Sequence, residues 1–248
     1  MPKIARFLVL CLLALSFVAT ADAGPRRRAV GKPVSGAPVG QCHTFDFVAP
    51  GLKATYLSTT PNGSATYTIT FISDTATQSK TSQIVSTPQG NATAVTTIDG
   101  EVVGNLRGMK HIDVTTTMTV PILGTLTTEI DVDFVPSLIL GPAAGWCVGN
   151  TWNVAPVTET ITTKAPLVQP TTQIVTTIGG SGEVLAVGEL VTVPAGTFAT
   201  VKYRGVTVAN NTVQTSITWT SMDHSIVVKQ QAFDPAGAIV TDTVLTDL

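Results

Sequence analysis

Apolar and polar residues alternate with a period of two along most of the chain beyond residue 42. In one stretch, Tyr67, Ile69 and Phe71 are separated by single threonines. Successive side chains of a strand point to opposite faces, so this pattern predicts antiparallel sheet with one apolar and one wet face. Threonine and valine, at about 40 and about 30 of the 248 residues, are β-branched and favour strands. The fold class is therefore predicted to be all-β.

Four short segments interrupt the alternation and are predicted to form tight turns. Asn, Asp and Gly adopt positive φ more easily than other residues, and Asp-Pro-x-Gly suits a type I turn. Because they separate short strands, hairpin connections are expected. The four segments are Asn62-Gly63, Asp99-Gly100, Asn210-Asn211 and the run from Asp234 to Gly237.

A change in the phase of the alternation at Gly205 predicts a β-bulge. The apolar positions are Val201 and Tyr203 before this glycine, and Val206 and Val208 after it. One extra residue in a strand bends the sheet and strengthens its twist. The expected architecture is therefore a curved antiparallel sheet, in the form of a barrel, half-barrel or sandwich.

Residues 1–23 have the pattern of a secretory signal peptide. Two basic residues precede the apolar run Phe7–Val18, and small residues follow up to Ala23. The run is short for a membrane span, so the mature chain is not expected to be transmembrane. Cys11 lies inside the run rather than at the cleavage point. We therefore expect an exported chain, periplasmic or secreted, that begins at Gly24 and carries no lipid anchor.

The remaining chain is expected to hold a short leader and one large domain. Residues 24–41 are rich in Gly, Pro and Ala, as expected of a flexible leader, and contain a basic cluster of Arg26, Arg27, Arg28 and Lys32. Residues 42–248 are predicted to form a single all-β domain. A Gly- and Pro-rich stretch at 141–145 leaves open a division into two β subdomains.

Two cysteines, Cys42 and Cys147, remain after removal of the signal. An even pair in an exported chain most often forms a disulfide, and this one would close a long loop. Two free buried thiols are an alternative. A metal site that uses Cys42 and His43 is a weaker one, because nothing nearby completes four ligands.

A motif in the second half carries a resemblance to a known family. The run Val191–Phe198 reads V-T-V-P-A-G-T-F, and Trp219, the segment Val227–Lys229 and a turn at Gly237 follow in that order. This order resembles secreted bacterial β-rich proteins of unknown function, and Val148–Trp152 looks like the usual opening of their module. The resemblance covers about half of the chain, from residue 146 to 248. It implies a curved sheet around an apolar interior, an extracytoplasmic location and no catalytic residues.

Four residues of this module are interpreted as scaffold. Pro194 ends a strand because it lacks an N–H donor, and Gly196 permits the turn that follows. Phe198 and Trp219 are expected to pack in the apolar core. The segment Met222–Ser225 departs from the Gly-containing turn of the family, so its role stays open.

Glu129, Asp131 and Asp133 form the best cluster of candidate metal ligands. Spaced by two along a predicted strand, they project from one face about 7 Å apart. Calcium binds such oxygens, but the sequence has no calcium-binding loop motif. A solvated strand face that discourages edge pairing is the favoured interpretation, and neither a metal nor a cofactor is expected.

Candidate catalytic residues are few. Ser221, Asp223, His224 and Ser225 are the residue types of a hydrolase, but neighbours on one turn cannot converge as a triad requires. The run Gly179–Glu183 misses the G-x-S-x-G motif at its last position. The chain is therefore expected not to be an enzyme.

Composition narrows the choice of partner. A net charge of −2 with 14 basic residues makes nucleic-acid binding a poor hypothesis. The leading hypothesis is a non-catalytic extracytoplasmic protein that holds an apolar or amphipathic ligand, such as a lipid, in a curved-sheet cavity. The alternative is a structural or surface-interaction protein whose core is filled by its own side chains, and an enzyme of unrecognised type comes third.

Overall fold

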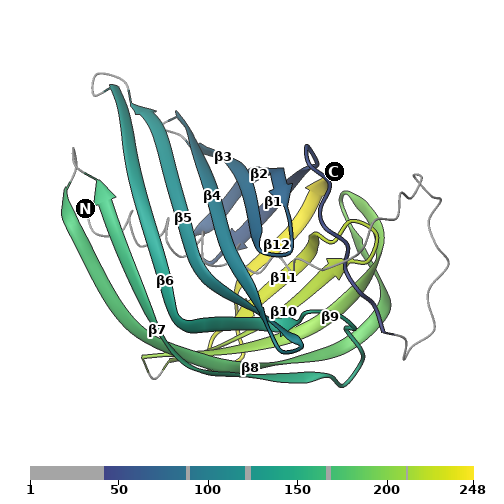
Figure 1. The fold of residues 1–248 in the computed structure, drawn as a ribbon. Coiled ribbons are helices and arrows are strands. Elements are labelled where there is room, and N and C mark those ends of the chain that lie inside the picture. The colour runs from purple at the N-terminus through teal and green to yellow at the C-terminus, as the bar shows by residue number, and fades with distance from the viewer. Residues whose placement is uncertain (1–41, 88–89, 121–123, 166–168, 211) are drawn as a thin grey trace.

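The computed structural model describes residues 42–248, apart from 88–89, 121–123, 166–168 and 211. In this described part of the chain, twelve antiparallel strands form a closed barrel in which each strand pairs with its neighbours in the sequence and β1 pairs with β12 (Figure 1). The predicted all-β class is confirmed, and a barrel is the form it takes. The expected signal peptide and leader lie outside the described residues. No helix in the described part of the chain is long and apolar enough to cross a membrane.

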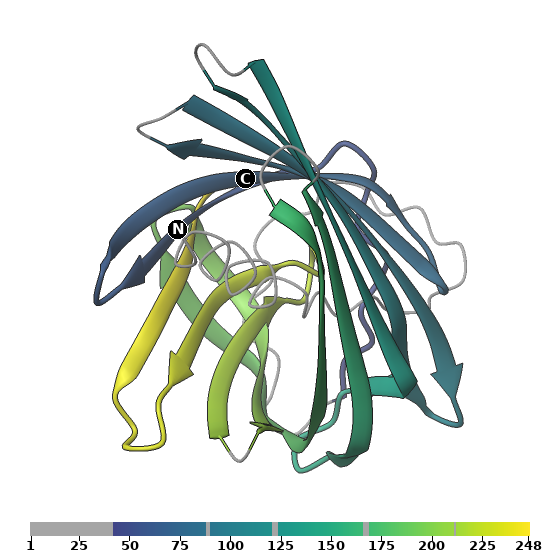
Figure 2. The same cartoon turned by 90° about the vertical axis from the view of Figure 1, so that its left-hand side faces the viewer.

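The strands differ in length, and the longest lie in the middle of the chain. They are β1 (Lys53–Thr60), β2 (Gly63–Asp74), β3 (Gln78–Thr87), β4 (Gly90–Val103), β5 (Leu106–Val120), β6 (Gly124–Pro142), β7 (Thr151–Ala165), β8 (Gln169–Val193), β9 (Gly196–Ala209), β10 (Thr212–Ser221), β11 (Val227–Phe233) and β12 (Ile239–Asp247). Figure 2 shows the sheet curving round on itself from β1 to β12.

The alternation in the sequence separates an inner from an outer face. On β6, Ile130 and Val132 are buried, whereas Glu129 and Asp133 on the opposite face are exposed. The buried apolar residues gather into three clusters. The first lies on β4 to β8 and includes Met109, Ile112, Val132, Phe134, Val157 and Ile178. The second includes Ala54, Tyr56, Ile69, Phe71, Val228 and Leu245, and the third includes Phe45, Trp146, Trp152, Val201 and Tyr203.

Three of the four predicted turns connect strands. Asn62 lies between β1 and β2, and Asn210 has a φ of 49° directly after β9. Between β11 and β12, the N–H of Gly237 donates to the carbonyl of Asp234 at 3.0 Å. These three turns were therefore predicted correctly, from residues that tolerate positive φ and from the Asp-Pro-x-Gly sequence.

The turn predicted at Asp99-Gly100 is wrong. Both residues lie within β4, and the pairing with β5 shifts register between them. The N–H of Gly100 donates to the carbonyl of Thr77 at 2.8 Å, outside the β4–β5 ladder. Gly100 thus lies at a bulge and contacts a distant segment of the chain. The turn of the β4–β5 hairpin is formed by residues 104–105 instead.

The bulge predicted at Gly205 is also wrong. The pairing of β9 with β10 runs through this residue without a shift, and the irregularities lie on the neighbouring β8, at 184–186 and 187–189. After Gly205 the apolar residues do change side, because Val208 points outward and is 40% exposed. The change of phase at Gly205 therefore reflects valines that face outward, and not an extra residue inserted in the strand.

Candidate functional site in the barrel interior

The barrel interior contains buried polar side chains besides the apolar clusters. Gln83, Thr116, Thr218 and Thr243 are at most 8% exposed. Each pairs across strands with a residue of the inner face; Thr218, for example, lies opposite Tyr203. Two of these residues form hydrogen bonds with polar side chains of neighbouring strands. The hydroxyl of Thr243 donates to Ser58 Oγ at 3.1 Å, and Gln230 Nε2 donates to Thr218 Oγ1 at 3.3 Å. The interior is thus partly apolar and partly hydrogen-bonding.

Glu159 on β7 is a buried acidic residue of this interior. It lies opposite Phe134 on β6 and Thr176 on β8, and it is 6% exposed. Its neighbours on the same face of β7 are Val157 and Ile161, both members of the first cluster. No hydrogen bond or ion pair within the described residues reaches its carboxyl group. Burial raises the pKa of Glu159 above its usual range, because the charged form loses its hydration.

Glu159 is not among the predicted site residues, although the alternation contains a signal for its position. In the run Val157, Glu159, Ile161, the glutamate occupies the apolar side of the alternation. Threonines hold the other side, so period-two reasoning alone places this carboxyl group inward.

The inner apolar face continues from Glu159 to an exposed end of the sheet. Ile161, which is 9% exposed, lies opposite Ile174, which is 58% exposed on the same face. An apolar side chain that is open to solvent at the end of a buried apolar face gives an apolar molecule a surface to contact.

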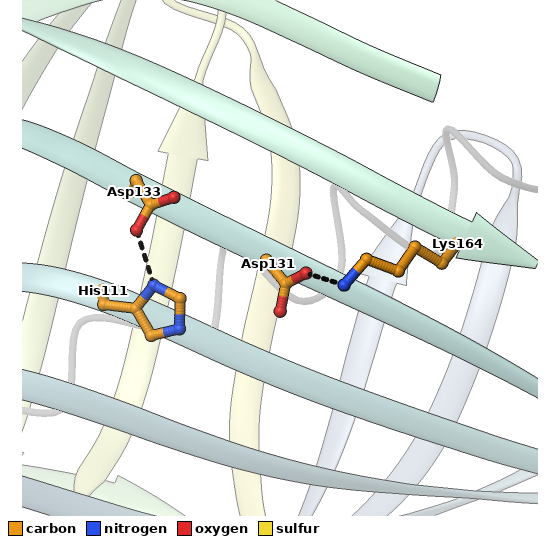
Figure 3. A network of polar contacts seen from close by, with 4 residues as sticks. All are labelled: His111, Asp131, Asp133 and Lys164. Atoms are coloured by element: carbon orange, nitrogen blue, oxygen red, sulfur yellow. Dashed lines mark hydrogen bonds and ion pairs between the residues drawn. The ribbon is translucent and has the colours of Figure 1, made fainter. Parts of the chain in front are cut away.

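The acidic residues of β6 lie on the outer face, as their spacing predicts. Asp131 accepts a hydrogen bond from Lys164 Nζ at 2.8 Å, and His111 Nδ1 lies 2.8 Å from Asp133 Oδ1 (Figure 3). Glu129 lies opposite Lys164 in the pairing with β7. Basic neighbours therefore offset the repulsion among these carboxylates. Within the described residues, no group of three or more His, Cys, Asp or Glu side chains could hold a metal ion.

Trp219 is buried, but not in the apolar core that the sequence interpretation expected. It shares the outer face with Lys202, and the ammonium nitrogens of Lys202 and Lys229 lie 5.0 and 5.4 Å from its ring centre. Its Nε1 donates to Glu189 Oε1 at 3.3 Å. Phe198 instead packs against the second cluster. The correction has a physical reason: long lysine side chains can cover an outward-facing ring as well as a core does.

The other motif residues lie at a strand connection. β8 ends at Val193 and β9 begins at Gly196, so Pro194 and Ala195 join the two strands. Gly196 has a φ of 138°. This is the placement that the scaffold interpretation expects.

A disulfide joins Cys42 to Cys147, as the pairing of the two mature cysteines predicts. Beside it, His43 and Trp146 exchange two backbone hydrogen bonds of 3.0 and 2.6 Å. The bond and the bridge tie the start of the described chain to the connection between β6 and β7. Burial lowers the pKa of His43, which favours a neutral imidazole there.

The two groups of candidate catalytic residues have structural roles. Ser221, Asp223, His224 and Ser225 lie at a turn, and the run Gly179–Glu183 lies in the closely packed strand β8. Ser221 Oγ accepts hydrogen bonds from the backbone N–H groups of Asp223 and His224, at 3.3 and 3.2 Å. This hydroxyl therefore caps the turn between β10 and β11. In β8, a Cβ atom at Gly182 would lie 2.0 Å from the ring of Trp152, and one at Gly180 would lie 1.8 Å from the carbonyl of Val206. Close packing explains these glycines.

A shallow hollow lies over β7, β8 and β9. Its volume is about 510 Å³, and its lining includes Thr151, Asn153, Ser181, Glu183, Arg204 and Val206. Arg204 donates to Glu183 at 2.6 Å, so the two charged groups of the hollow satisfy each other. Glu159, by contrast, is buried and has no such partner within the described residues.

No family model matches this chain, and no curated protein matches its sequence. Two solved structures are similar in fold. One is a candidate exported protein with a YmcC-like fold from Bacteroides fragilis, with 12% identity and a TM-score of 0.42, and the match covers 81% of this chain and 98% of that one. The other is a candidate lipoprotein from Parabacteroides distasonis, with 11% identity, a TM-score of 0.35 and coverage of 80% and 95%. Both similarities are too remote to bear on function.

Proposed function

We propose that this chain is an exported, non-catalytic protein that holds an apolar or amphipathic ligand inside its β-barrel. One observation carries the proposal: a closed barrel of twelve strands whose inner surface combines apolar clusters with buried polar groups. Barrels of about eight strands are just wide enough to be filled by their own side chains or to hold one small ligand. A barrel of twelve strands has more interior to fill.

Two features support export. The pattern of residues 1–23 is that of a signal peptide, and the cysteine pair forms a disulfide. Disulfides persist in oxidising compartments such as the periplasm or the extracellular medium. The proposed location is therefore extracytoplasmic.

The outer face of the barrel supports a location in water. It carries ion pairs, among them Asp131 with Lys164, Glu189 with Lys202, and Glu183 with Arg204. Charged side chains on the lipid face of a membrane barrel cost about 2–4 kcal/mol each near the midplane. We therefore propose that the ligand comes to the protein, rather than that the protein spans a membrane.

The alternative is a structural or surface-interaction protein. One pair of outer residues favours it: Val208 and Val213 lie opposite each other on β9 and β10 and are 40% and 42% exposed. Exposed apolar pairs of this kind can contact another protein. Two residues are a small patch, however, so ligand holding is the function we favour.

The proposal can be tested with an apolar fluorescent probe and two neighbouring residues of β10. Ser216 lies on the inner face opposite Gly205, and Thr215 lies on the outer face opposite Val206. If the ligand is held inside, Ser216→Trp should weaken probe binding at least about tenfold, because the ring occupies the interior. Thr215→Trp should leave binding unchanged. Equal affinities for both variants and the parent chain would contradict an interior site.

A further inference from the structure

Glu159 is isolated from other charges. In the described parts of β6, β7 and β8, the other inward-facing residues are uncharged. The nearby acidic and basic groups, such as Asp131 and Lys164, point outward and pair with each other. The interior near β7 therefore has one ionisable group and no opposite charge from these strands.

A buried carboxyl group without a partner is costly. Its charged form loses hydration, and its neutral form still needs a hydrogen-bond partner. Proteins tolerate such groups where they act, so an isolated carboxyl group on an inner surface suggests a binding role. A molecule that enters the barrel would supply that partner.

We propose that Glu159 binds the ammonium group of an amphiphilic amine whose apolar part lies in the barrel. This inference rests on the proposed function and adds the charge of the ligand. An ammonium group supplies both the opposite charge and hydrogen-bond donors to the carboxylate. The hydroxyl of Thr176, on the residue opposite Glu159, can accept a second of its protons.

The surroundings match the rest of such a molecule. Phe134, Val157 and Ile161 adjoin Glu159 on the inner face and belong to one apolar cluster. The exposed Ile174 extends this face toward solvent. An alkyl chain can lie along these residues while its head contacts the carboxylate. A fatty acid is disfavoured, because its carboxylate would face Glu159.

The test compares three probes of equal chain length by calorimetric titration: decylammonium, decanol and decanoate. The intact mature chain should bind decylammonium at least about tenfold more tightly than decanol, since a hydrogen bond between opposite charges is stronger than one between neutral groups. Decanoate should bind most weakly. In Glu159→Gln the preference for the amine over the alcohol should disappear, while decanol affinity stays the same.

Three further variants complete the test. Glu129→Gln changes a glutamate on the outer face of β6 and should keep the preference for the amine. If Glu159→Gln folds poorly, Glu159→Leu replaces it, because an apolar side chain suits this surface. A preference that survives in both Glu159 variants overturns the inference. So does a tenfold gain in amine affinity when Arg26, Arg27 and Arg28 are changed together to Gln, because the leader would then be the partner.

Failure of this inference can be told apart from failure of the proposed function. If the three probes bind equally well and their binding is lost in Ser216→Trp, the barrel holds ligands but does not select amines. If none of the three probes binds, the proposed function itself is contradicted.

Discussion

Glu159 lies directly opposite Phe134 in the pairing of β7 with β6, so a buried carboxyl group has an aromatic residue where an ion pair would have a cation. This arrangement predicts a conflict between stability and function. Burial of an unpartnered polar group costs about 1–3 kcal/mol in proteins. A group that carries this cost is what the proposed binding role predicts.

Replacing Glu159 by Leu should therefore stabilise the protein. We expect the free energy of unfolding in urea to rise by about 1–3 kcal/mol, because the desolvation cost of the carboxyl group is removed. Glu129→Leu on the outer face should change it by less than about 0.5 kcal/mol. A large loss of stability in Glu159→Leu would show that the carboxyl group has a structural partner.

Asp74 predicts a specific dependence of stability on pH. Burial raises the pKa of Asp74 to about 6, although the N–H of Val48 donates to its Oδ2 at 2.9 Å. The folded chain thus holds this proton more tightly than the unfolded chain, whose pKa is near 3.8. The stability contributed by the protonated form is fully present below the unfolded pKa and is lost as the pH rises through about 6.

The variant Asp74→Asn isolates this effect, because its side chain does not titrate. The difference in unfolding free energy between the variant and the parent chain should grow in favour of the variant from pH 4 to about 6. Urea unfolding at matched pH values measures it. A difference that stays constant over this range would mean that Asp74 keeps the same pKa on unfolding.

Trp219 and Lys202 should be energetically coupled. The ammonium nitrogen lies 5.0 Å from the ring centre, and a partly covered cation–π contact contributes about 0.5–2 kcal/mol. A double-mutant cycle with Trp219→Leu and Lys202→Met should give a coupling free energy in that range. Additive effects would show that the lysine lies over the ring without stabilising it.

The outer carboxylates of β6 should contribute little to the stability of the fold. Ala substitutions of Glu129, Asp131 and Asp133 should each change the free energy of unfolding by less than about 0.5 kcal/mol, since exposed ion pairs are weak. Calcium should not shift the melting temperature of the parent chain. Calcium-dependent stabilisation that is lost on changing any one carboxylate would instead identify a metal site.

The disulfide should be important for stability but not for the fold. Replacing Cys42 and Cys147 together by Ala should lower the unfolding free energy by up to about 4–5 kcal/mol, because the bond spans 105 residues of the chain. The β-rich circular dichroism spectrum should persist. Two alkylatable thiols in the exported protein would show that the bond does not form.

Local patterns in the sequence predicted the strands well, because period-two alternation reports directly on the two faces of a sheet. The closure of the sheet into a barrel could not be predicted in this way. The pairing of β1 with β12 joins residues nearly 200 positions apart, such as Leu57 and Val244, and no local pattern encodes it. The Asp99-Gly100 turn failed for a similar reason, since a distant carbonyl, that of Thr77, holds Gly100 in a bulge.

The candidate site was only partly predictable. The alternation correctly placed Trp219 on the same face as Ile217, but it did not show that lysine side chains rather than the core cover that face. Glu159 could have been placed inward from its neighbours Val157 and Ile161. The lack of a partner for its carboxyl group could not have been predicted, because it depends on which side chains of β6 and β8 lie opposite.

The most direct test of ligand holding is native mass spectrometry of the protein purified from its own periplasm or medium. We predict a complex with one retained molecule of lipid-like mass per chain, and loss of that molecule in Ser216→Trp but not in Thr215→Trp. The mass of the bare mature chain alone, under gentle conditions that preserve a known lipid complex, would contradict the account.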